Sequence, residues 1–455
     1  MMKMMKRVLA LLLMLAVCCT LTACKKDEAA NTDTVATTAA AGKPDDVLLT
    51  VGGRAVTRAD YEGYLATLIN YYANYGYDAS TDPELAAILQ QYALETGIEY
   101  AVLDLKLEEL GLSLSDEEKA AATAEAKAEW EATLQDGLIY YGITEESTEE
   151  DRANTLLTVL AELESMGYTE ESYLKDAIAF AGYDKIMAHV TKDVTVSDED
   201  VLNYYNSLVE ADKQTYENDA AAYEQTQYMN QMYAMYGMTD YVTEIYYKPA
   251  GYRLVTHILL EASEELLTAY TDLQAAYEEQ QNTIEEGGEV TGELVTEAEI
   301  ENARLAILAD VQPQVDEINQ KLAEGTTFAE LIPLYSTDPG MMDEAAIAAG
   351  YEVHMDSTNW VIPFRDQAFT VSNIGDVTAP VVTDYGVHII QYVADVPGGP
   401  VELTEEMRAS FYDSLLSTAQ NEKYSAAIAE WVEAAEVVYS DEAKAILGTT
   451  EEAAQ

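Results

Sequence analysis

Two histidines in separate β-rich segments are the side chains of this sequence best placed to do chemistry together. His257 lies in the run Tyr-Arg-Leu-Val-Thr-His-Ile-Leu-Leu (252–260), and His388 lies in Val-Thr-Asp-Tyr-Gly-Val-His-Ile-Ile-Gln-Tyr (382–392). One histidine in an apolar β-run is most often a satisfied core residue. Two of them, each beside further motifs, favour a shared site. The remaining histidines, His189 and His354, have no such neighbours and are predicted to be surface or core residues.

Three further motifs lie between the two histidine segments. They are Leu-Ala-Glu-Gly-Thr-Thr-Phe-Ala-Glu-Leu (322–331), Tyr-Ser-Thr-Asp (335–338) and Trp-Val-Ile-Pro-Phe-Arg-Asp-Gln-Ala-Phe (360–369). In this order the motifs resemble the parvulin family of peptidyl-prolyl cis/trans isomerases. The resemblance implies a domain at 250–397, a small antiparallel sheet flanked by helices, that isomerises X–Pro bonds in polypeptides.

The resemblance also implies roles for individual residues. His257 and His388 match paired histidines that lie side by side on adjacent strands, and Thr383 matches a threonine whose hydroxyl orients one of them. Asp338 stands where the family carries either cysteine or aspartate, although an aspartate before Pro339-Gly340 also suits a turn. These four residues are the catalytic candidates.

The substrate-binding residues implied by the resemblance are Met355, Trp360, Phe364 and Tyr385. The first three would form an apolar cradle for the proline ring, and the two aromatic residues among them would be buried in any case. Three departures from the family pattern bear on turnover, one of which is Val361 in place of a frequent polar contact. Glu352 stands near a position that is normally apolar, and Tyr385 stands where a small residue is common. They keep open an alternative protein whose parvulin fold has lost turnover and only binds clients.

Prolyl isomerisation needs no metal, cofactor or covalent intermediate, and none is predicted for this chain. The uncatalysed barrier of about 18–20 kcal/mol arises because twisting the C–N bond breaks the amide resonance. An enzyme can lower it with an apolar proline pocket, by excluding water and by stabilising the twisted amide electrostatically. The sequence has no phosphate loop, metal-ligand spacing or nucleophile triad, which argues against a metalloenzyme.

The N-terminus has the pattern of a lipoprotein leader. A basic start (1–7) precedes an apolar run (8–17) that is shorter than the roughly 20 residues of a membrane span, and Leu-Thr-Ala-Cys follows, ending at Cys24. This ending resembles the lipobox of bacterial lipoproteins. It implies a signal peptide at 1–23, lipidation of Cys24 and an anchor on the extracytoplasmic face of the bacterial cell membrane. Ordinary secretion with an incidental Cys24 is the alternative. Residues 24–45 are predicted to be a flexible tether.

Composition restricts the partners. Loss of the leader leaves 21 basic and 83 acidic residues, a net charge of −62, so nucleic acid and anionic lipid would be repelled. The acidic surface is explained most simply by solubility, and a preference for basic or unfolded clients is the functional alternative. All three cysteines lie at or before position 24, so no disulfide framework or catalytic thiol is expected. The oligomeric state is left open.

Residues 46–249 have the periodicity of a helical domain. A hairpin is predicted at 46–56, with Gly52-Gly53 at its turn. The helices that follow are predicted to begin at capping residues: Thr57, Asp82, Ser115, Thr148, Thr169 and Ser197. The hairpin and the phrase Val-Thr-Val-Ser-Asp-Glu-Asp (194–200) resemble the N-terminal chaperone domains of SurA- and PrsA-type foldases. The expected fold class is therefore α+β and mostly helical, and the expected clients are unfolded exported polypeptides.

A run rich in methionine and tyrosine (223–238) is the candidate for client binding outside the parvulin-like segment. Methionine is flexible and polarisable, and tyrosine offers contact area with little rotamer entropy to lose. The same stripe is also typical of a helix that faces a domain core. Both interpretations stay open.

The other segments complete the predicted organisation. Residues 262–323, broken by Glu-Glu-Gly-Gly (285–288), predict a helical hairpin inserted in the parvulin segment. An amphipathic C-terminal helix (398–440) is expected to pack on the chaperone domain, and 441–455 is expected to be a tail. A third interpretation, a lipoprotein that captures a solute, would need βαβ repeats, which the helical pattern does not show.

Overall fold

A computed structural model describes residues 42–290 and 294–448. The predicted signal peptide and Cys24 lie outside these described residues. The described residues divide into two compact units. The first is formed by those up to Val196 together with those from Tyr412 onward, and the second by those between Ser197 and Phe411. Within the described ranges, no helix has both the length and the apolar character needed to cross a membrane.

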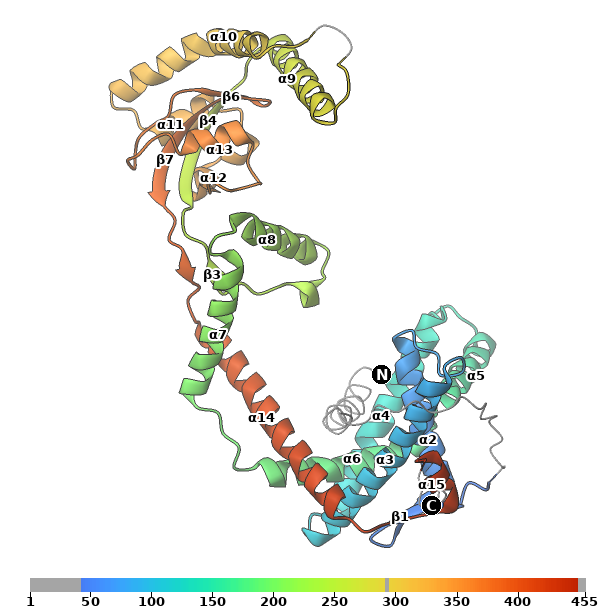
Figure 1. The fold of residues 1–455 in the computed structure, drawn as a ribbon. Helices are drawn as coiled ribbons and strands as arrows, with labels where there is room; N and C mark the ends of the chain where they lie inside the picture. The colour runs from blue at the N-terminus through green and yellow to red at the C-terminus, as the bar shows by residue number, and fades with distance from the viewer. Residues whose placement is uncertain (1–41, 291–293, 449–455) are drawn as a thin grey trace. The chain divides into compact units, whose positions relative to one another are not determined.

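The first unit is mostly helical (Figure 1). Its main helices are α2 (Arg58–Asn74), α3 (Pro83–Glu109), α4 (Asp116–Tyr140), α5 (Glu149–Ser165) and α6 (Glu170–Thr191). They begin at the predicted capping residues. Thr57, Ser115, Thr148 and Thr169 each form a capping box, and the Asp82 side chain accepts the backbone amides of Glu84 and Leu85. Local side-chain chemistry therefore accounts for these starts, because each cap satisfies amides that the first helical turn leaves without partners.

A three-stranded antiparallel sheet of order β2-β1-β9 joins the two ends of the first unit. The strands β1 (Val47–Val51) and β2 (Arg54–Thr57) form the predicted hairpin, and β9 (Val437–Tyr439) pairs with β1. The long helix α14 (Glu405–Ala434) leads to β9, and its Tyr424 and Ile428 lie in a core cluster of this unit.

The residues after β9 differ from the predicted tail. Asp441–Ile446 form the short helix α15, in which Ala443 is fully buried. The Arg58 guanidinium, on α2, forms an ion pair with Glu442. This helix, capped by Ser440, is too short for its sequence periodicity to predict it. A helix of this length gains its stability from tertiary contacts.

The second unit begins with α7 (Asp198–Tyr216) and α8 (Ala220–Met235), followed by η1 (Thr239–Tyr241) and the short pair β3 (Tyr247–Lys248) and β8 (Gly399–Pro400). The predicted chaperone domain extended to 249, whereas these helices lie in the same compact unit as the parvulin-like segment. Tyr216, Tyr223 and Tyr252 share one buried cluster, which explains the difference.

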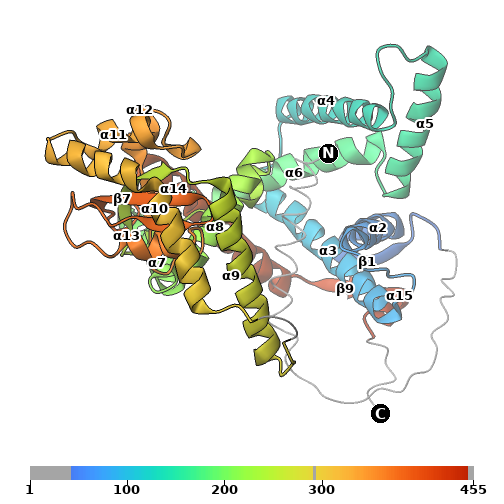
Figure 2. The ribbon, with the colours of Figure 1, turned by 90° about the horizontal axis from the view of Figure 1, so that it is seen from above.

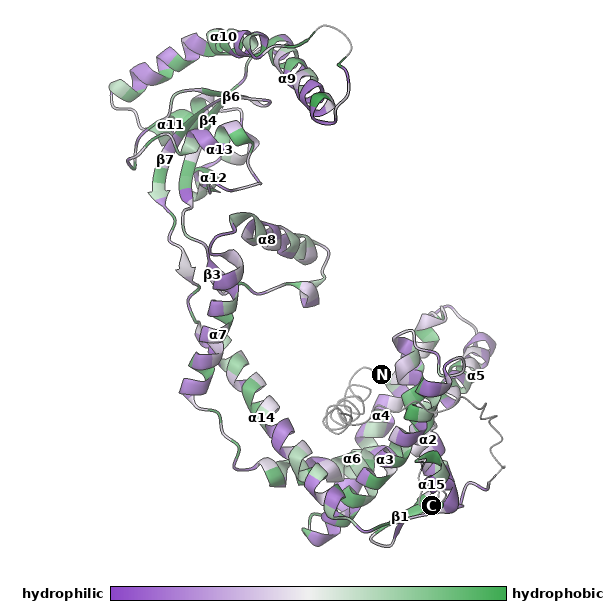
Figure 3. Ribbon diagram, viewed as in Figure 1, coloured by the Kyte–Doolittle hydropathy of each residue, from purple (hydrophilic) through white to green (hydrophobic). Residues whose placement is uncertain are grey.

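A four-stranded antiparallel sheet of order β5-β4-β7-β6 lies at the centre of the parvulin-like segment. Its strands are β4 (Arg253–Leu260), β5 (Tyr351–Val353), β6 (Val381–Thr383) and β7 (Gly386–Asp395), and Figure 3 shows β7 as largely hydrophobic. The helices around it are α11 (Phe328–Tyr335), α12 (Glu344–Ala349) and α13 (Ile362–Ala368), with η2 (Pro339–Met341) between the first two.

The long helices α9 (Glu264–Glu285) and α10 (Glu297–Ala323) form a helical hairpin between β4 and α11 (Figure 2). The two helices span nearly the predicted 262–323. Ile307 and Ile318 of α10 are fully buried in the cluster that contains Ile258 and Leu331. The C-terminal part of α10 therefore belongs to the core that supports the sheet.

Candidate active site

The β4–β7 pair places both predicted histidines on one face of the sheet. In the antiparallel register His257 lies opposite Ile390, and His388 lies opposite Leu259. Alternate residues of a strand point to the same face, so the two imidazoles share the face that also carries Val255 and Ile390. Helix α13 packs against this face, while α10 and α11 pack against the other.

The four predicted catalytic residues form one hydrogen-bonded chain. Nδ1 of His257 lies 2.9 Å from Nδ1 of His388, and the two rings stack with centroids 5.0 Å apart. Nε2 of His257 is 2.6 Å from Oδ2 of Asp338, and Nε2 of His388 is 2.8 Å from Oγ1 of Thr383. Oδ1 of Asp338 also accepts the Gly340 amide at 3.1 Å, so this aspartate is both a turn residue and a histidine partner.

The charges of this chain follow from its surroundings. The hydrogen bond from His257, assisted by one from the Tyr351 hydroxyl, lowers the pKa of Asp338 to about 2. Burial, assisted by the neighbouring His257, lowers the pKa of His388 to about 3. At neutral pH the site therefore contains an ionised aspartate and a neutral His388.

These charges orient the hydrogen bonds. An ionised carboxylate only accepts, so Nε2–H of His257 donates to Asp338. Nδ1 of His257 then shares one hydrogen bond with Nδ1 of His388, and Nε2 of His388 shares one with the hydroxyl of Thr383. The Thr383 oxygen in turn accepts the backbone amide of Tyr385 at 3.1 Å. Hydrogen bonds at both ring nitrogens hold each imidazole in a fixed orientation.

An aromatic wall stands over the histidines. Phe364 is 2% exposed, and its ring centroid lies 5.1 Å from those of His257 and His388. Trp360 stacks on Phe364 at 5.3 Å. The side chains of Met355 and Tyr385 are 43% and 67% exposed, and Tyr385 reaches the hydrogen-bonded series through its backbone only. Phe364 therefore contacts both histidines, with Trp360 stacked on it, and the other two predicted substrate-binding residues lie at the surface.

Tyr351 belongs to this site although the sequence reasoning did not select it. Its hydroxyl donates to Oδ2 of Asp338 at 2.8 Å, and its ring lies 4.8 Å from that of Trp360. Glu352, the next residue of β5, is exposed and forms an ion pair with Lys248 at 2.6 Å. The acidic residue therefore lies outside the aromatic wall. The alternation Tyr-Glu-Val indicates that these neighbours face opposite sides of the strand, but it does not indicate which of them faces the site.

Within the described ranges, no group of three or more His, Cys, Asp or Glu side chains is arranged to hold a metal ion. The hydrogen bonds of both histidines are instead made to each other, to Asp338 and to Thr383. The arrangement can bind an apolar ring over a rigid polar floor.

Comparison with known proteins assigns the segment that contains most of this site. Residues 303–396 match the family model described as PPIC-type PPIASE domain. The chain carries a parvulin-type isomerase domain. Foldase protein PrsA 2 of Listeria monocytogenes is 34% identical over 121 residues, which are 26% of this chain and 39% of that protein. Foldase protein PrsA of Clostridium botulinum is 22% identical over 278 residues, which are 60% of this chain and 56% of that protein.

The chain thus spans 39% of the length of the Listeria relative that it matches. Among solved structures, a SurA-like chaperone of Campylobacter jejuni is 16% identical, with 87% of this chain and 100% of that chain covered at a TM-score of 0.25. PrsA from Bacillus subtilis is also 16% identical, with 72% and 90% covered at a TM-score of 0.18. The isomerase domain is identified by the family match at 303–396.

Proposed function

We propose that this protein is a lipid-anchored extracytoplasmic foldase that isomerises X–Pro bonds and holds exported polypeptides while they are unfolded. The observation that carries the catalytic part is the His257–His388 pair beneath the Phe364–Trp360 wall. Asp338 and Thr383 fix the pair from its two ends.

The proposed catalysis is differential binding of the twisted amide. The planar amide is polarised by resonance and well hydrated, whereas the twisted amide has lost this resonance. An apolar wall that excludes water therefore favours the twisted form over the planar one. The hydrogen-bonded histidine pair offers a polar floor. Each tenfold acceleration needs only about 1.4 kcal/mol of such preference.

The test is a prolyl isomerisation assay on the chain without its leader, with proline peptides that vary the preceding residue. We expect acceleration above background, and its loss when His257→Ala and His388→Ala are combined, with suppression of client aggregation retained. His189→Ala, an exposed histidine of α6, is the matched control. A folded wild-type protein without turnover would favour the alternative, a parvulin-fold chaperone that only binds clients. Retained turnover in the double variant would contradict the proposed site.

The holding activity is supported by the Met/Tyr run at 223–238. Tyr223 and Glu224 at its start are buried, whereas Met235 and Tyr236 are 71% and 68% exposed. The start of α8 therefore suits the domain-core interpretation of the run, and the exposed apolar residues at its end suit the client-binding interpretation. Such a surface suits unfolded segments, because methionine adapts to varied partners.

The anchor is supported by the leader pattern that ends at Cys24. Mass spectrometry of the N-terminal peptide from cells should find a diacylated Cys24 and no residues before it. Cys24→Ser should release the protein from the membrane fraction. An unmodified Cys24 in wild type would favour ordinary secretion.

A further inference from the structure

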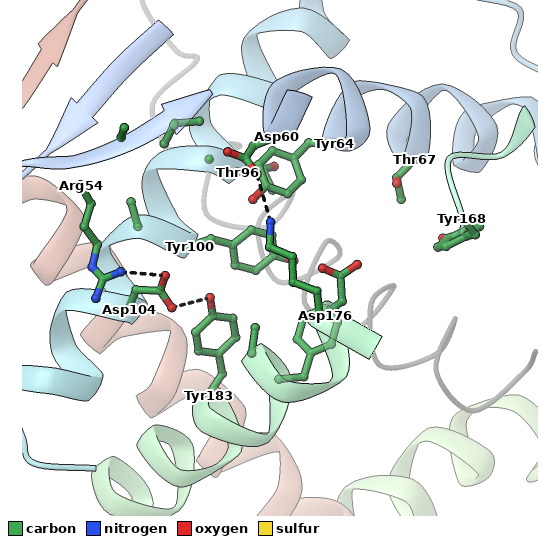
Figure 4. A pocket seen from close by; sticks show the side chains of 17 residues that line it. Arg54, Asp60, Tyr64, Thr67, Thr96, Tyr100, Asp104, Tyr168, Asp176 and Tyr183 are labelled. Carbon is green, nitrogen blue, oxygen red and sulfur yellow. Dashed lines mark hydrogen bonds and ion pairs between the residues drawn. The ribbon is translucent and has the colours of Figure 1, made fainter. Parts of the chain in front are cut away.

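A cavity of about 310 Å³ lies within the first unit, remote in sequence from the isomerase domain. Figure 4 shows its side chains, which come from β2, α2, α3 and α6, with Tyr168 from the loop before α6. Its volume is at the lower end of the roughly 300–1,000 Å³ of ligand pockets. The cavity therefore fits one side chain or a small molecule of similar size.

One wall of the cavity is aromatic. The rings of Tyr100 and Tyr183 are nearly parallel, at 8°, with centroids 5.7 Å apart, and Tyr64 lies 5.3 Å from Tyr100. Phe180 continues this wall at 6.1 Å from Tyr183. Aromatic faces attract cations through the ring quadrupole, and they also pack against the methylene stem of a long side chain.

The charged side chains of the cavity are paired except for one. Arg54 lies 3.4 Å from Asp104, and Lys175 lies 3.4 Å from Asp60. Asp176 forms no hydrogen bond or ion pair among the described residues, although it lines the same cavity. The ammonium of Lys175, the preceding residue on α6, is directed to Asp60 instead.

The surroundings of Asp176 disfavour a lone negative charge. Burial raises its pKa to about 6, against the lowering effect of the Lys175 charge. A cation that binds in the cavity next to such a buried carboxylate stabilises its negative charge. A divalent metal would need several oxygen ligands, whereas the other two aspartates already have partners. An organic cation on an apolar stem needs only one carboxylate and the aromatic wall.

We propose that this cavity binds the ammonium or guanidinium group of a lysine or arginine side chain of an unfolded client. Asp176 serves as counter-ion, and the rings of Tyr64, Tyr100 and Tyr183 contact the stem and the charge. This inference rests on the proposed holding function and gives it a preference for basic segments. A free alkylammonium compound has the same chemistry and is the other possible source of the cation.

The experiment measures binding of fluorescent unfolded peptides by anisotropy to the chain without its leader. One peptide contains a single lysine in a neutral, proline-free context, and a second carries N-acetyl-lysine at that position. We expect the lysine peptide to bind at least tenfold more tightly, and Asp176→Asn to remove this difference. Asp193→Asn removes the same charge from an exposed site beyond α6 and should leave the difference intact.

Three results would overturn the proposal. Equal effects of Asp176→Asn and Asp193→Asn would mean that only overall charge matters. Equal binding of the two peptides to wild type would exclude recognition of the cation. Displacement of the lysine peptide by cadaverine at equal concentrations would assign the cavity to free amines instead of polypeptides.

Two controls distinguish this inference from the foldase proposal and from a structural role of Asp176. Isomerisation of a lysine-free proline peptide should be the same in wild type and Asp176→Asn, so a failure of the foldase proposal would be seen independently. The free energy of unfolding of Asp176→Asn should equal or exceed that of wild type, because no partner of Asp176 is lost. A less stable variant would show that this carboxyl has a structural role.

Discussion

Glu224 is a buried carboxyl that fixes α8 to the isomerase domain, and its replacement gives a quantitative test of the second unit. The side chain is 4% exposed. Oε1 accepts the hydroxyl of Tyr252 at 3.1 Å, and Oε2 accepts the hydroxyl of Ser357 at 2.8 Å and the amide of Thr358 at 3.2 Å. Tyr252 and Ser357 are themselves 3% and 1% exposed, so water cannot take the place of the carboxyl without rearrangement.

The change Glu224→Leu removes the acceptor and keeps most of the side-chain volume. A buried donor that loses its partner costs about 1–3 kcal/mol, and two buried hydroxyls are affected. The Thr358 residue is exposed, so its amide can bond to water. Leucine also removes the cost of burying a carboxyl. We therefore expect the free energy of unfolding of the second unit to fall by about 2–4 kcal/mol.

The combined change of Glu224→Leu with Tyr252→Phe and Ser357→Ala removes the stranded donors as well. It should recover at least half of the loss, because apolar replacement of both partners is nearly neutral. Glu224→Gln should cost less than Glu224→Leu, since one amide oxygen can still accept and the Tyr252 hydroxyl can turn to accept from the amide nitrogen.

The assay is urea unfolding followed by the fluorescence of Trp360, which lies three residues after Ser357. Changing Trp130 and Trp431, both in the first unit, to phenylalanine makes the signal specific to the second unit. The reasoning is refuted if the triple variant loses as much stability as the sum of its single changes. A loss below about 0.5 kcal/mol for Glu224→Leu, the size of an ordinary surface effect, would equally refute it.

Three further predictions test other parts of the molecule. Because the pKa of His388 is lowered to about 3 while an unfolded histidine titrates near pH ~6.5, the unfolded state takes up this proton first as pH falls. Urea unfolding of wild type should therefore lose about 2 kcal/mol more than that of His388→Gln between pH 7.5 and pH 5, and parallel losses would contradict a buried neutral His388. Gly386 has φ 135°, and an added Cβ would lie 2.5 Å from the Leu260 carbonyl oxygen. Gly386→Ala should therefore displace β7 and lower isomerisation at least tenfold. Gly375 has φ 94° but open space around it, so Gly375→Ala should lower stability without that loss of isomerisation. Changing Met232 and Met235 to Asp should weaken client binding severalfold in an aggregation assay and leave the unfolding free energy nearly unchanged, and an unaltered client affinity would remove the end of α8 from the holding surface.

The candidate site was largely predictable from sequence because its main residues lie in short motifs whose local geometry is regular. His257 and His388 each occupy an alternating strand position, and Asp338 and Thr383 occupy the ends of a helix and a strand. Tyr351 could not be selected in this way. The choice between Tyr351 and Glu352 depends on which face of β5 meets the site, and a shift of one residue reverses that face.

The starts of the helices were determined by the sequence alone, because a capping residue such as Thr57 or Ser115 acts within four positions of itself. Only the tertiary structure decided which helices belong together. Glu224 and Ser357 are separated by 133 positions in the sequence, and no local pattern pairs a carboxyl on α8 with a hydroxyl in the isomerase domain. The same holds for the lone carboxyl of Asp176, whose surroundings come from four separate elements. Local hydrogen bonds and periodicity are determined by neighbouring residues, whereas burial and charge pairing depend on the packing of the whole unit.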